Sequence, residues 1–280
     1  AMVRNLLRID PYAFQMINLA ASGRRFFGGM DMGFGVSDLD FFDKVFKHPS
    51  FKDRQDIRVL SLGYADVVIS DTAYFKRFRG VNWKSILKGR DNRERLLQIH
   101  GGDPTLISIV PTLPSFFDLY GNVSVDVLDF TQYEGSEIIQ DMNEPIPASL
   151  ANSYDLVIDG GATEHCFDIA RALFNCAEMA KVGGFVYHAV PMNMLNHGFY
   201  NLNPTLLCDF YEDNGFETIQ CSGVGTGIKE ISTFFDLPPV QRFNVSGGEA
   251  CMHYLARKVE ARETFVKPVQ RKYRDVEAWR

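Results

Sequence analysis

The sequence predicts an α/β fold built on a doubly wound, mostly parallel β-sheet. Short runs of consecutive apolar residues recur along the chain, which is typical of strands that are buried on both faces. Segments with helical apolar spacing separate these runs, as the crossover connections between parallel strands require. The chain has 280 residues, of which 46% are hydrophobic, so it can bury a core of the necessary size.

We expect the first 50 residues to form a helical extension ahead of the sheet. Residues 1–35 have helical apolar spacing and then several glycines, which predicts a helix followed by a loop. A second helix is expected at residues 38–47, because Pro49 disfavours its continuation. The aromatic residues from Phe26 to Phe42 indicate either a lid that excludes water from a site or ordinary core packing.

A domain that carries the sheet is expected over residues 51–257. Its predicted strands are residues 57–62, 123–130, 137–141, 154–159, 185–190, 216–221 and 250–257. Its predicted helices lie near residues 83–99, 115–120, 166–181 and 204–214. We expect Gly183 and Gly184 to end the third of these helices. The charged tail at residues 258–280 is expected to lie on the surface.

Composition narrows the classes of function. A net charge of −6 argues against a nucleic-acid partner and against an anionic membrane surface. No apolar run approaches the roughly 20 residues that span a bilayer, and no signal-like segment is evident. The five cysteines never form a Cys-x-x-Cys pair, which favours a reducing, cytoplasmic location and argues against a zinc site. A homo-oligomer remains open.

Candidate site residues follow from the rule that doubly wound sheets bind ligands beyond the carboxyl ends of their strands. Gly63 follows the first predicted strand, where the absence of a Cβ lets a ligand approach the backbone. Asp129 ends the second strand, and a carboxylate there can accept hydrogen bonds from both hydroxyls of a ribose. Asp141 follows the third strand and precedes Met142, so the pair suits an adenine ring. Asp159 ends the fourth strand.

From residue 137 to residue 190 the sequence resembles the middle of a class I S-adenosylmethionine-dependent methyltransferase. An Asp-plus-apolar pair, a proline-containing loop, the motif "YDLV", an exposed turn, a helix and a "K-x-GG" turn occur in the order typical of that family. The resemblance implies a Rossmann-like seven-stranded sheet, S-adenosylmethionine as cofactor and S-adenosylhomocysteine as product. It also places Gly63 under the methionine part of the cofactor, Asp129 at the ribose, and Asp141 with Met142 at the adenine.

The first motif departs from the family pattern. Ser61 stands where the family has an acidic residue, and Gly63 is the only glycine that is retained. Asp66 either replaces a missing contact to the cofactor or only caps a helix. Asp159 and Gly160, at the end of the fourth strand, complete the set of cofactor-binding candidates. The gap from the first motif to the second strand is also longer than is usual, which indicates an insertion.

Two histidines are candidates for the chemistry. Methyl transfer to a hydroxyl is an in-line displacement that a general base accelerates, and histidine has a suitable pKa for that role. His165 follows the fourth strand and His197 follows the fifth, so both should lie near the transferred methyl group. Glu164 is a weaker candidate base, and His188 is expected to be a core residue because it lies within a strand. No compact ligand spacing predicts a metal site here.

These observations favour a methyltransferase that acts on a small polar metabolite, with oxygen as the acceptor atom. The segment "NHGFYNLN" is similar to a subgroup that acts on sugars and other hydroxylated metabolites. A nicotinamide-dependent oxidoreductase on a similar sheet is one alternative, although the motif G-x-G-x-x-G is missing at Gly63. A methyltransferase-like scaffold without catalytic activity is the other, because the first motif is degenerate.

Overall fold

The computed structural model describes most of the predicted sheet domain. The described residues are 33–34, 36–51, 54–67, 113–132, 136–226, 232–237, 241–243, 248–262 and 264–274. The helix expected within residues 1–35, Phe26 and the helix expected near 83–99 lie outside them. None of the helices in the described part is long and apolar enough to span a membrane.

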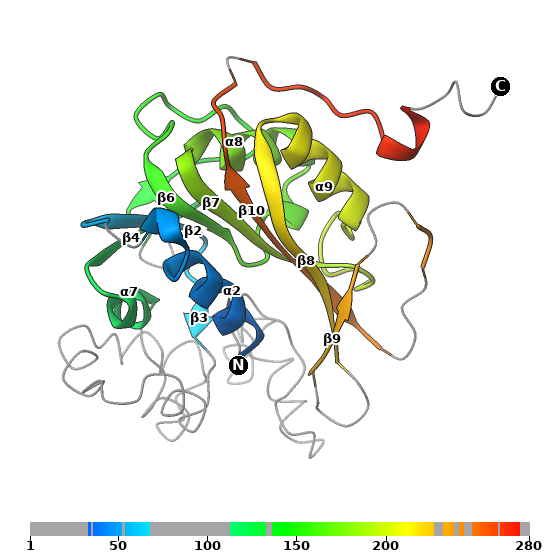
Figure 1. The fold of residues 1–280 in the computed structure, drawn as a ribbon, viewed down its shortest axis with the longest axis horizontal. Coiled ribbons are helices and arrows are strands. Elements are labelled where there is room, and N and C mark those ends of the chain that lie inside the picture. Colours follow the sequence, from blue (N-terminus) through cyan, green and yellow to red (C-terminus); the bar gives the residue numbers. More distant parts are fainter. Residues whose placement is uncertain are drawn as a thin grey trace, which may run out of the picture. The chain divides into compact units, whose positions relative to one another are not determined.

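The described strands build one large sheet in the order β5-β4-β2-β6-β7-β10-β8-β9 (Figure 1). Their bounds are β2 Ile57–Leu62, β4 Val123–Asp129, β5 Ile138–Ile139, β6 Tyr154–Asp159, β7 Ala180–Pro191, β8 Phe216–Thr226, β9 Ser232–Asp236 and β10 Ala250–Lys258. A separate parallel pair joins β1 (Gly33–Phe34) to β3 (Asp66–Val67). All seven predicted strands are present, and β9 extends the sheet beyond β8.

The topology is that of the doubly wound fold. Strands β5, β4, β2, β6 and β7 are mutually parallel, whereas β10 runs antiparallel to both of its neighbours, β7 and β8. From the central β2 the chain adds β4 and β5 on one side and then crosses to β6 and β7 on the other. The topological switch point therefore lies between β2 and β6, where Leu62 is in register with Asp159. The predicted Rossmann-like α/β fold is confirmed.

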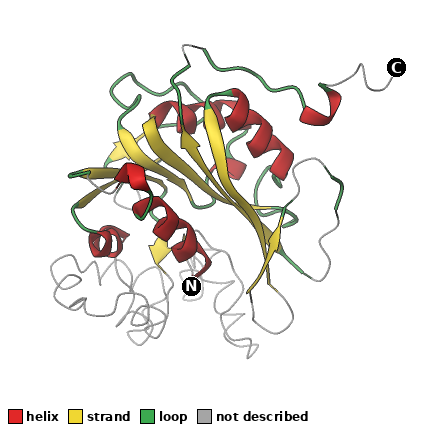
Figure 2. Cartoon of the chain, viewed as in Figure 1, coloured by secondary structure: helices red, strands yellow, loops and turns green. Residues whose placement is uncertain are grey.

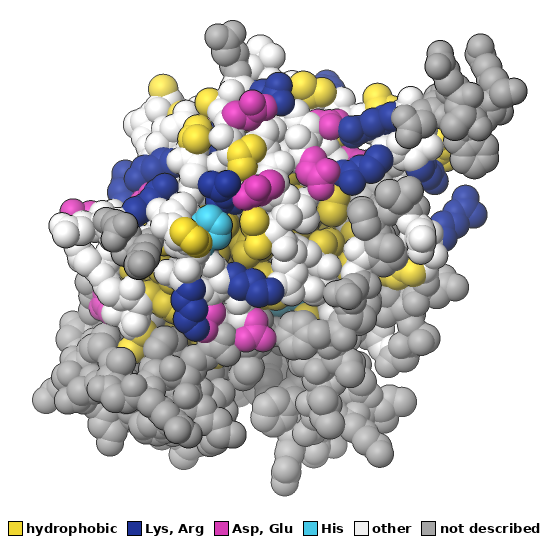
Figure 3. All heavy atoms as spheres, viewed as in Figure 1, with side chains coloured by type: hydrophobic (Ala, Val, Ile, Leu, Met, Phe, Trp, Pro, Cys, Tyr) yellow, Lys and Arg dark blue, Asp and Glu magenta, His cyan; other side chains and the backbone are white. Residues whose placement is uncertain are grey.

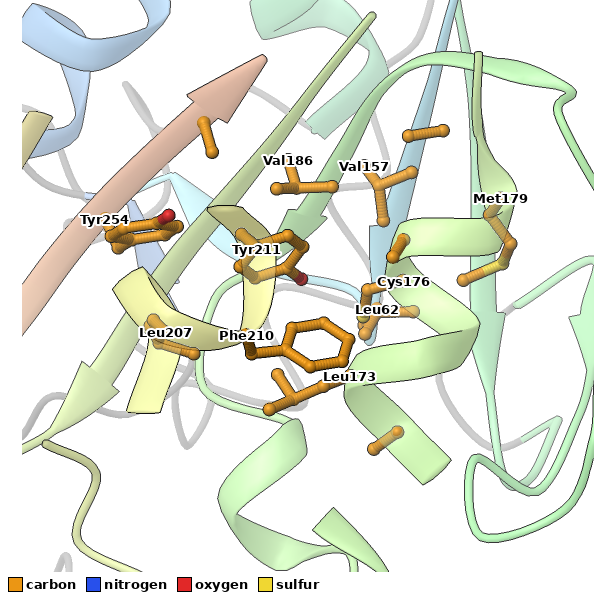
Figure 4. Packing of buried hydrophobic residues seen from close by; sticks show 14 of the residues in the cluster. Leu62, Val157, Leu173, Cys176, Met179, Val186, Leu207, Phe210, Tyr211 and Tyr254 are labelled. Atoms are coloured by element: carbon orange, nitrogen blue, oxygen red, sulfur yellow. The ribbon is translucent and has the colours of Figure 1, made fainter. Parts of the chain in front are cut away.

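Helices cover both faces of the sheet, as its strands of consecutive apolar residues require (Figure 2). Helices α8 (Ile169–Met179) and α9 (Pro204–Asp213) pack on one face, with Leu173 and Phe210 against Val157 and Val186 of the sheet (Figure 4). Helices α2 (Val36–Phe46) and α7 (Leu113–Phe117) cover the other face. Single turns of 3-10 helix lie at Pro49–Phe51, Asp118–Tyr120, Thr163–His165 and Arg271–Tyr273.

Helix α2 contributes to the core. Phe41 and Phe42 are completely buried, and both rings contact Tyr187 of the sheet at centroid distances of 5.2 and 5.3 Å. Phe42 also packs against Phe117 of helix α7 at 5.3 Å. For these two phenylalanines the core-packing interpretation is therefore correct and the lid interpretation is wrong.

The double glycine after helix α8 has a different role from the one predicted. The helix ends at Met179, and β7 begins at the next residue, so Gly183 and Gly184 lie within the long strand. Gly183 has a φ of +79°, which favours glycine. A Cβ on Gly184 would lie 2.9 Å from the carbonyl oxygen of Asp155. The pair thus forms an irregularity in β7 that lets it approach β6 closely.

The surface carries charges of both signs. On the face that Figure 3 shows, lysine and arginine side chains lie beside aspartate and glutamate side chains. Ion pairs of the described surface include Arg257 with Glu217 and Arg274 with Asp213. This mixed pattern agrees with the small net charge of the sequence.

Candidate functional site

Gly63 begins the tight turn that follows β2. Its φ is +72°, and its N–H donates to the carbonyl oxygen of Leu128, 2.8 Å away at the end of β4. The hydroxyl of Ser61 is completely buried and donates to the Gly63 carbonyl at 2.8 Å. Ser61 therefore holds the backbone of the turn.

The next two candidates occupy different settings. Asp66 lies in β3, where its backbone is in register with Gly33 of β1; its side chain is outside the described part of the chain. Asp129 ends β4 at the carboxyl edge and is half-buried. Its Oδ1 accepts a hydrogen bond from the N–H of Thr131 at 3.0 Å. Asp129 therefore lies at the carboxyl edge of the sheet, where the sequence predicts it.

Asp141 and Met142 lie in a turn after β5. The Oδ1 of Asp141 accepts hydrogen bonds from the backbone N–H and the side-chain amide of Asn143, both at 2.8 Å. Met142 is only 7% exposed and packs in the core, which leaves little surface for an adenine contact. Asn175 of helix α8 donates to the carbonyl oxygens of Met142 and Glu144. Sequence reasoning did not identify Asn143 and Asn175, which tie this turn to helix α8.

Asp159, a predicted cofactor ligand, is buried and forms its hydrogen bonds within the protein. The residue has no exposed surface, and its Oδ1 accepts three backbone N–H bonds from the turn at residues 161–163. Its Oδ2 lies 2.7 Å from Nδ1 of His188, and the hydroxyl of Thr163 donates to it at 2.5 Å. Burial would raise the pKa of Asp159, but the bonds from His188, Thr163 and Ala162 lower it below its ordinary value.

His188 is a core residue, as the sequence predicts. Its Nε2 lies 2.6 Å from the hydroxyl of Tyr211 on helix α9, and its ring has no exposed surface. A buried chain therefore runs from the turn after β6 through Asp159 and His188 to Tyr211. The sequence carried no signal for Tyr211, because its part in the chain depends on the packing of α9 against the sheet.

The turn after β6 packs closely. Gly160 is half-buried, and a Cβ there would lie 3.2 Å from Cε1 of Phe34. Gly161 has a φ of +108°. The turn leads directly into the 3-10 helix Thr163–His165, so the hydrogen bonds to Asp159 fix the position of the residues that follow.

His165 and His197 come together, as their positions after neighbouring strands predict. Their ring centroids are 5.3 Å apart, and their side chains are 47% and 30% exposed. Burial and the neighbouring His197 lower the pKa of His165. Asn196, with a φ of +63°, turns the backbone just before His197. The imidazole rings of His165 and His197 therefore lie next to each other at the carboxyl edge of the sheet, and both are partly exposed.

Glu164 lies between the two histidines and is completely buried. Its Oε1 is 3.4 Å from Nε2 of His197 and 3.9 Å from Nε2 of His165. Among the described residues, neither carboxylate oxygen accepts a hydrogen bond. Burial and the nearby Asp159 carboxylate raise the pKa of Glu164 to about 8. The sequence predicts Glu164 as a weaker candidate base than the histidines, and the burial that raises its pKa cannot be recognised from the sequence.

The backbone of Glu164 joins the two loops of the site. Its carbonyl oxygen accepts hydrogen bonds from the N–H groups of Phe199 and Tyr200, at 2.9 and 3.3 Å. A Cβ on Gly198 would lie 2.9 Å from Cγ of Glu164, so only glycine lets the loop after β7 approach so closely. This loop therefore packs directly on the turn after β6.

Two exposed aromatic rings lie on the same two loops as the histidines, each two residues after one of them in the sequence. Phe167 and Phe199 are 74% and 67% exposed, and their rings meet edge to face at a centroid distance of 5.8 Å. The hydroxyl of Tyr200 donates to the carbonyl oxygen of Phe167 at 2.8 Å, which links the two loops again. Exposed aromatic rings next to polar groups are suited to hold a ring-shaped ligand.

No family model matches the sequence, and no curated protein matches it. The fold is similar to the solved 1,6-didemethyltoxoflavin-N1-methyltransferase of Burkholderia thailandensis, with a TM-score of 0.40 and 11% identity, covering 88% of this chain and 87% of that chain. It is also similar to the 16S rRNA (adenine(1408)-N(1))-methyltransferase of Catenulisporales acidiphilia, with a TM-score of 0.37 and 12% identity, covering 80% of this chain and 94% of that chain.

Proposed function

We propose that the protein is an S-adenosylmethionine-dependent methyltransferase that methylates a hydroxyl group of a small polar metabolite. The observation that carries this proposal is the arrangement around the switch point. The glycine turn at Gly63 and the carboxylate of Asp129 lie on one side of it, and the two histidines lie on the other. A crevice at the switch point is where doubly wound sheets bind nucleotide ligands.

Each half of the edge has its own task in this proposal. The turns after β2, β4 and β5 bind the cofactor, with Gly63 near its methionine part, Asp129 at the ribose and Asp141 at the adenine. Gly160 gives the backbone of the turn after β6 room beside the ligand, and Asp66 remains a candidate through the position of its backbone. Asp159 acts through the buried chain, since it holds the turn that carries Glu164 and His165.

The acceptor binds beside the two histidines. The exposed rings of Phe167 and Phe199 give an apolar contact, and one imidazole takes the proton of the hydroxyl as its oxygen attacks the methyl carbon. Burial lowers the pKa of His165, so its ring is neutral near pH 7 and can accept a proton. The net charge of −6 and the mixed charges of the surface support a small acceptor over a nucleic acid.

Thermal unfolding with added nucleotides tests the cofactor assignment. S-adenosylhomocysteine at about 100 times its Kd should stabilise the folded protein by about 2.7 kcal/mol, because it binds only the native state. NAD and NADP should give no shift. Stabilisation by NAD or NADP alone would favour the oxidoreductase, and no shift with any of them, together with no binding by calorimetry, would favour the scaffold without a cofactor.

Two variants test the placement of the cofactor. Asp141→Ala should weaken S-adenosylhomocysteine binding by about tenfold or more, since a hydrogen bond to a charged group contributes about 1.5–3 kcal/mol. Glu217→Ala is the matched control, because Glu217 is exposed and lies at the amino end of β8, on the opposite edge of the sheet. Equal effects from the two variants would show that the adenine does not bind at Asp141.

Histidine variants test the acceptor side. At least one of His165→Ala and His197→Ala should lower turnover by about 10²-fold or more, the smaller end of what a general base contributes. Affinity for S-adenosylhomocysteine should stay unchanged, because both side chains lie on the acceptor side. Full activity in the double variant would exclude the histidines as bases.

A further inference from the structure

The side chains of Glu164, His165 and His197 converge on one point. Oε1 of Glu164 lies 3.4 Å and 3.9 Å from the two Nε2 atoms, and one ligand atom of each residue lies within 4.8 Å of the other two. Ligands held about 2.1 Å from a tetrahedral ion are about 3.4 Å apart. Rotation of the partly exposed His165 ring would close the remaining difference, so the cluster is close to the spacing that a shared ion requires.

The burial of Glu164 independently indicates a cation. Its side chain has no exposed surface, and neither oxygen accepts a hydrogen bond within the described part of the chain. A carboxylate in this setting loses its hydration without compensation, which is one of the costliest arrangements in a protein interior. Nε2 of each histidine lies within 4 Å of Oε1, and imidazole nitrogens are themselves metal ligands. A bound ion would compensate the charge.

The backbone holds this cluster in place before any ion binds. The Glu164 carbonyl accepts two N–H bonds from the loop that carries His197, and Gly198 allows the loop to pack against the Glu164 side chain. On the other side, Asp159 fixes the turn that leads into Glu164 and His165. Three ligands on two mutually fixed loops lose little freedom when they bind a metal.

We propose that Glu164, His165 and His197 bind one divalent transition-metal ion. Two imidazole nitrogens and one carboxylate oxygen suit Zn²⁺, Fe²⁺, Mn²⁺ or Co²⁺, whereas Mg²⁺ and Ca²⁺ prefer sites made only of oxygen. The histidine side chains are 47% and 30% exposed, so the ion keeps open positions on its outer side. Three protein ligands with open positions are typical of catalytic rather than structural sites.

This inference goes beyond the proposed function, because metal binding is measurable without methyl transfer. It also has a consequence for that function. A bound metal ion would lower the pKa of a hydroxyl acceptor that it binds, so the hydroxyl would release its proton to solvent water before its oxygen attacks the methyl carbon. The imidazoles of His165 and His197 are then ligands and do not take up the proton. Activity of the metal-free protein therefore separates the histidine-base mechanism from a metal-dependent one.

The test is a titration of the full-length, chelator-treated protein with Zn²⁺ in a calorimeter and with Co²⁺ by visible absorption. We expect one ion per chain. Glu164→Gln, His165→Ala and His197→Ala should each weaken binding by at least about tenfold, since changes outside the direct ligands already cost 10–100-fold. His48→Ala is the matched control, because His48 is half-buried and belongs to a different part of the fold. Circular dichroism confirms that each variant is folded.

Two results would overturn the proposal: no binding of either ion by the wild-type protein, or equal binding by the wild type and by the variant that lacks all three side chains. Binding of Mg²⁺ as tight as that of Zn²⁺ would show that the class of ion is wrong. The thermal shift with S-adenosylhomocysteine is measured on the same metal-free sample. A shift without metal binding would refute only this inference, and metal binding without a shift would refute only the proposed cofactor.

Discussion

Glu164, a candidate site residue at the carboxyl edge of the sheet, is buried in a setting that is energetically unfavourable for a carboxylate. Glu164 is completely buried and has no hydrogen-bond partner for its carboxylate among the described residues, although two histidines lie within 4 Å of it. Such groups lower the stability of the folded state, and they persist where the surrounding structure forces them into place. Glu164 is therefore the residue whose replacement should separate stability from function most clearly.

Glu164→Gln should stabilise the metal-free protein by about 1–3 kcal/mol. A carboxyl group buried without partners must either carry an uncompensated charge or hold a proton against its ordinary pKa, and an amide of the same shape avoids both costs. Urea unfolding of the chelator-treated protein measures the change. Glu217→Gln, an exposed position in β8, is the control and should leave the free energy of unfolding unchanged. Destabilisation by Glu164→Gln would mean that the carboxylate has favourable contacts.

His253 should make stability depend on pH. It is fully buried in β10, with Nδ1 2.5 Å from the Tyr187 hydroxyl and 3.6 Å from Asp38. Burial lowers its pKa, and the Asp38 carboxylate offsets only part of that effect. As the pH falls below 6.5, His253 therefore becomes protonated in the unfolded state before it does so in the folded state. Its contribution to the free energy of unfolding is complete above pH 6.5 and is lost as the pH falls below that value.

His253→Gln tests this dependence. Urea unfolding is measured at pH 7 and at pH 5, on either side of the ordinary histidine pKa of about 6.5. Between these two pH values the free energy of unfolding should fall less for the variant than for the wild type. The glutamine amide can still reach the Tyr187 hydroxyl, so the fold should persist. An equal fall in the free energy of unfolding for the two proteins would show that His253 carries a proton in the folded state.

Individual helices and strands could be predicted from the sequence where the residues within the segment itself determine its structure. Strands β2 and β6 occupy the expected residues, because each is a mostly apolar run that ends directly before a glycine. Helix α8 ends at Met179, two residues before the predicted end at residue 181. Gly183 and Gly184 look like a helix cap in sequence, but the pairing of Ala180 with Tyr154 draws the preceding residues into β7.

The candidate site could be predicted only in part, for the same reason. The positions of His165 and His197 after neighbouring parallel strands were enough to predict that they meet. The burial of Glu164 and the inward direction of Asp159 depend on contacts between loops and helices that no local pattern records. Asp209, which looks like an ordinary surface residue of helix α9, is likewise buried and paired with Arg271.

The loop after β7 provides a prediction at the level of one element. Gly198→Ala would place a Cβ 2.9 Å from both Cγ and the carbonyl oxygen of Glu164, so the loop must move away from the turn after β6. We expect turnover to fall at least about tenfold, since small displacements of positioning groups have large effects on rate. Binding of S-adenosylhomocysteine should be unchanged, because its proposed ligands lie on other turns. Loss of both together would indicate general misfolding.

At the scale of the whole described fold, the C-terminal segment is more than a surface tail. Phe265 stacks on Phe174 of helix α8 at a centroid distance of 5.3 Å. The buried Asn214, at the end of helix α9, donates to the carbonyl oxygen of Val266 and accepts from its N–H, at 2.9 and 2.6 Å. Residues 264–274 thus cover the outer side of the helical layer that packs on one face of the sheet.

Arg271 adds an electrostatic contact to this segment. Its Nε lies 3.1 Å from Asp209 and its Nη2 lies 2.6 Å from Glu212, both on helix α9. The backbone N–H of Arg271 also donates to Asp209 at 2.8 Å. Because the Asp209 side chain is only 3% exposed, loss of these donors would leave a buried carboxylate without its partners.

Removal of residues 264–280 should therefore destabilise the protein without abolishing cofactor binding. The deletion takes away the Phe265 contact and the hydrogen bonds to Asn214 and Asp209, and we expect a loss of about 2–4 kcal/mol, because each buried group left unsatisfied costs about 1–3 kcal/mol. Arg271→Ala should reproduce about 1 kcal/mol of this loss, since the partly exposed guanidinium is screened by solvent. Urea unfolding measures both changes.

Calorimetry with S-adenosylhomocysteine should give an unchanged Kd, because the segment packs on the outer side of α8 and α9, whereas the proposed cofactor residues lie at the ends of β2, β4 and β5. A deletion that lowered cofactor affinity as much as stability would show that the segment shapes the site.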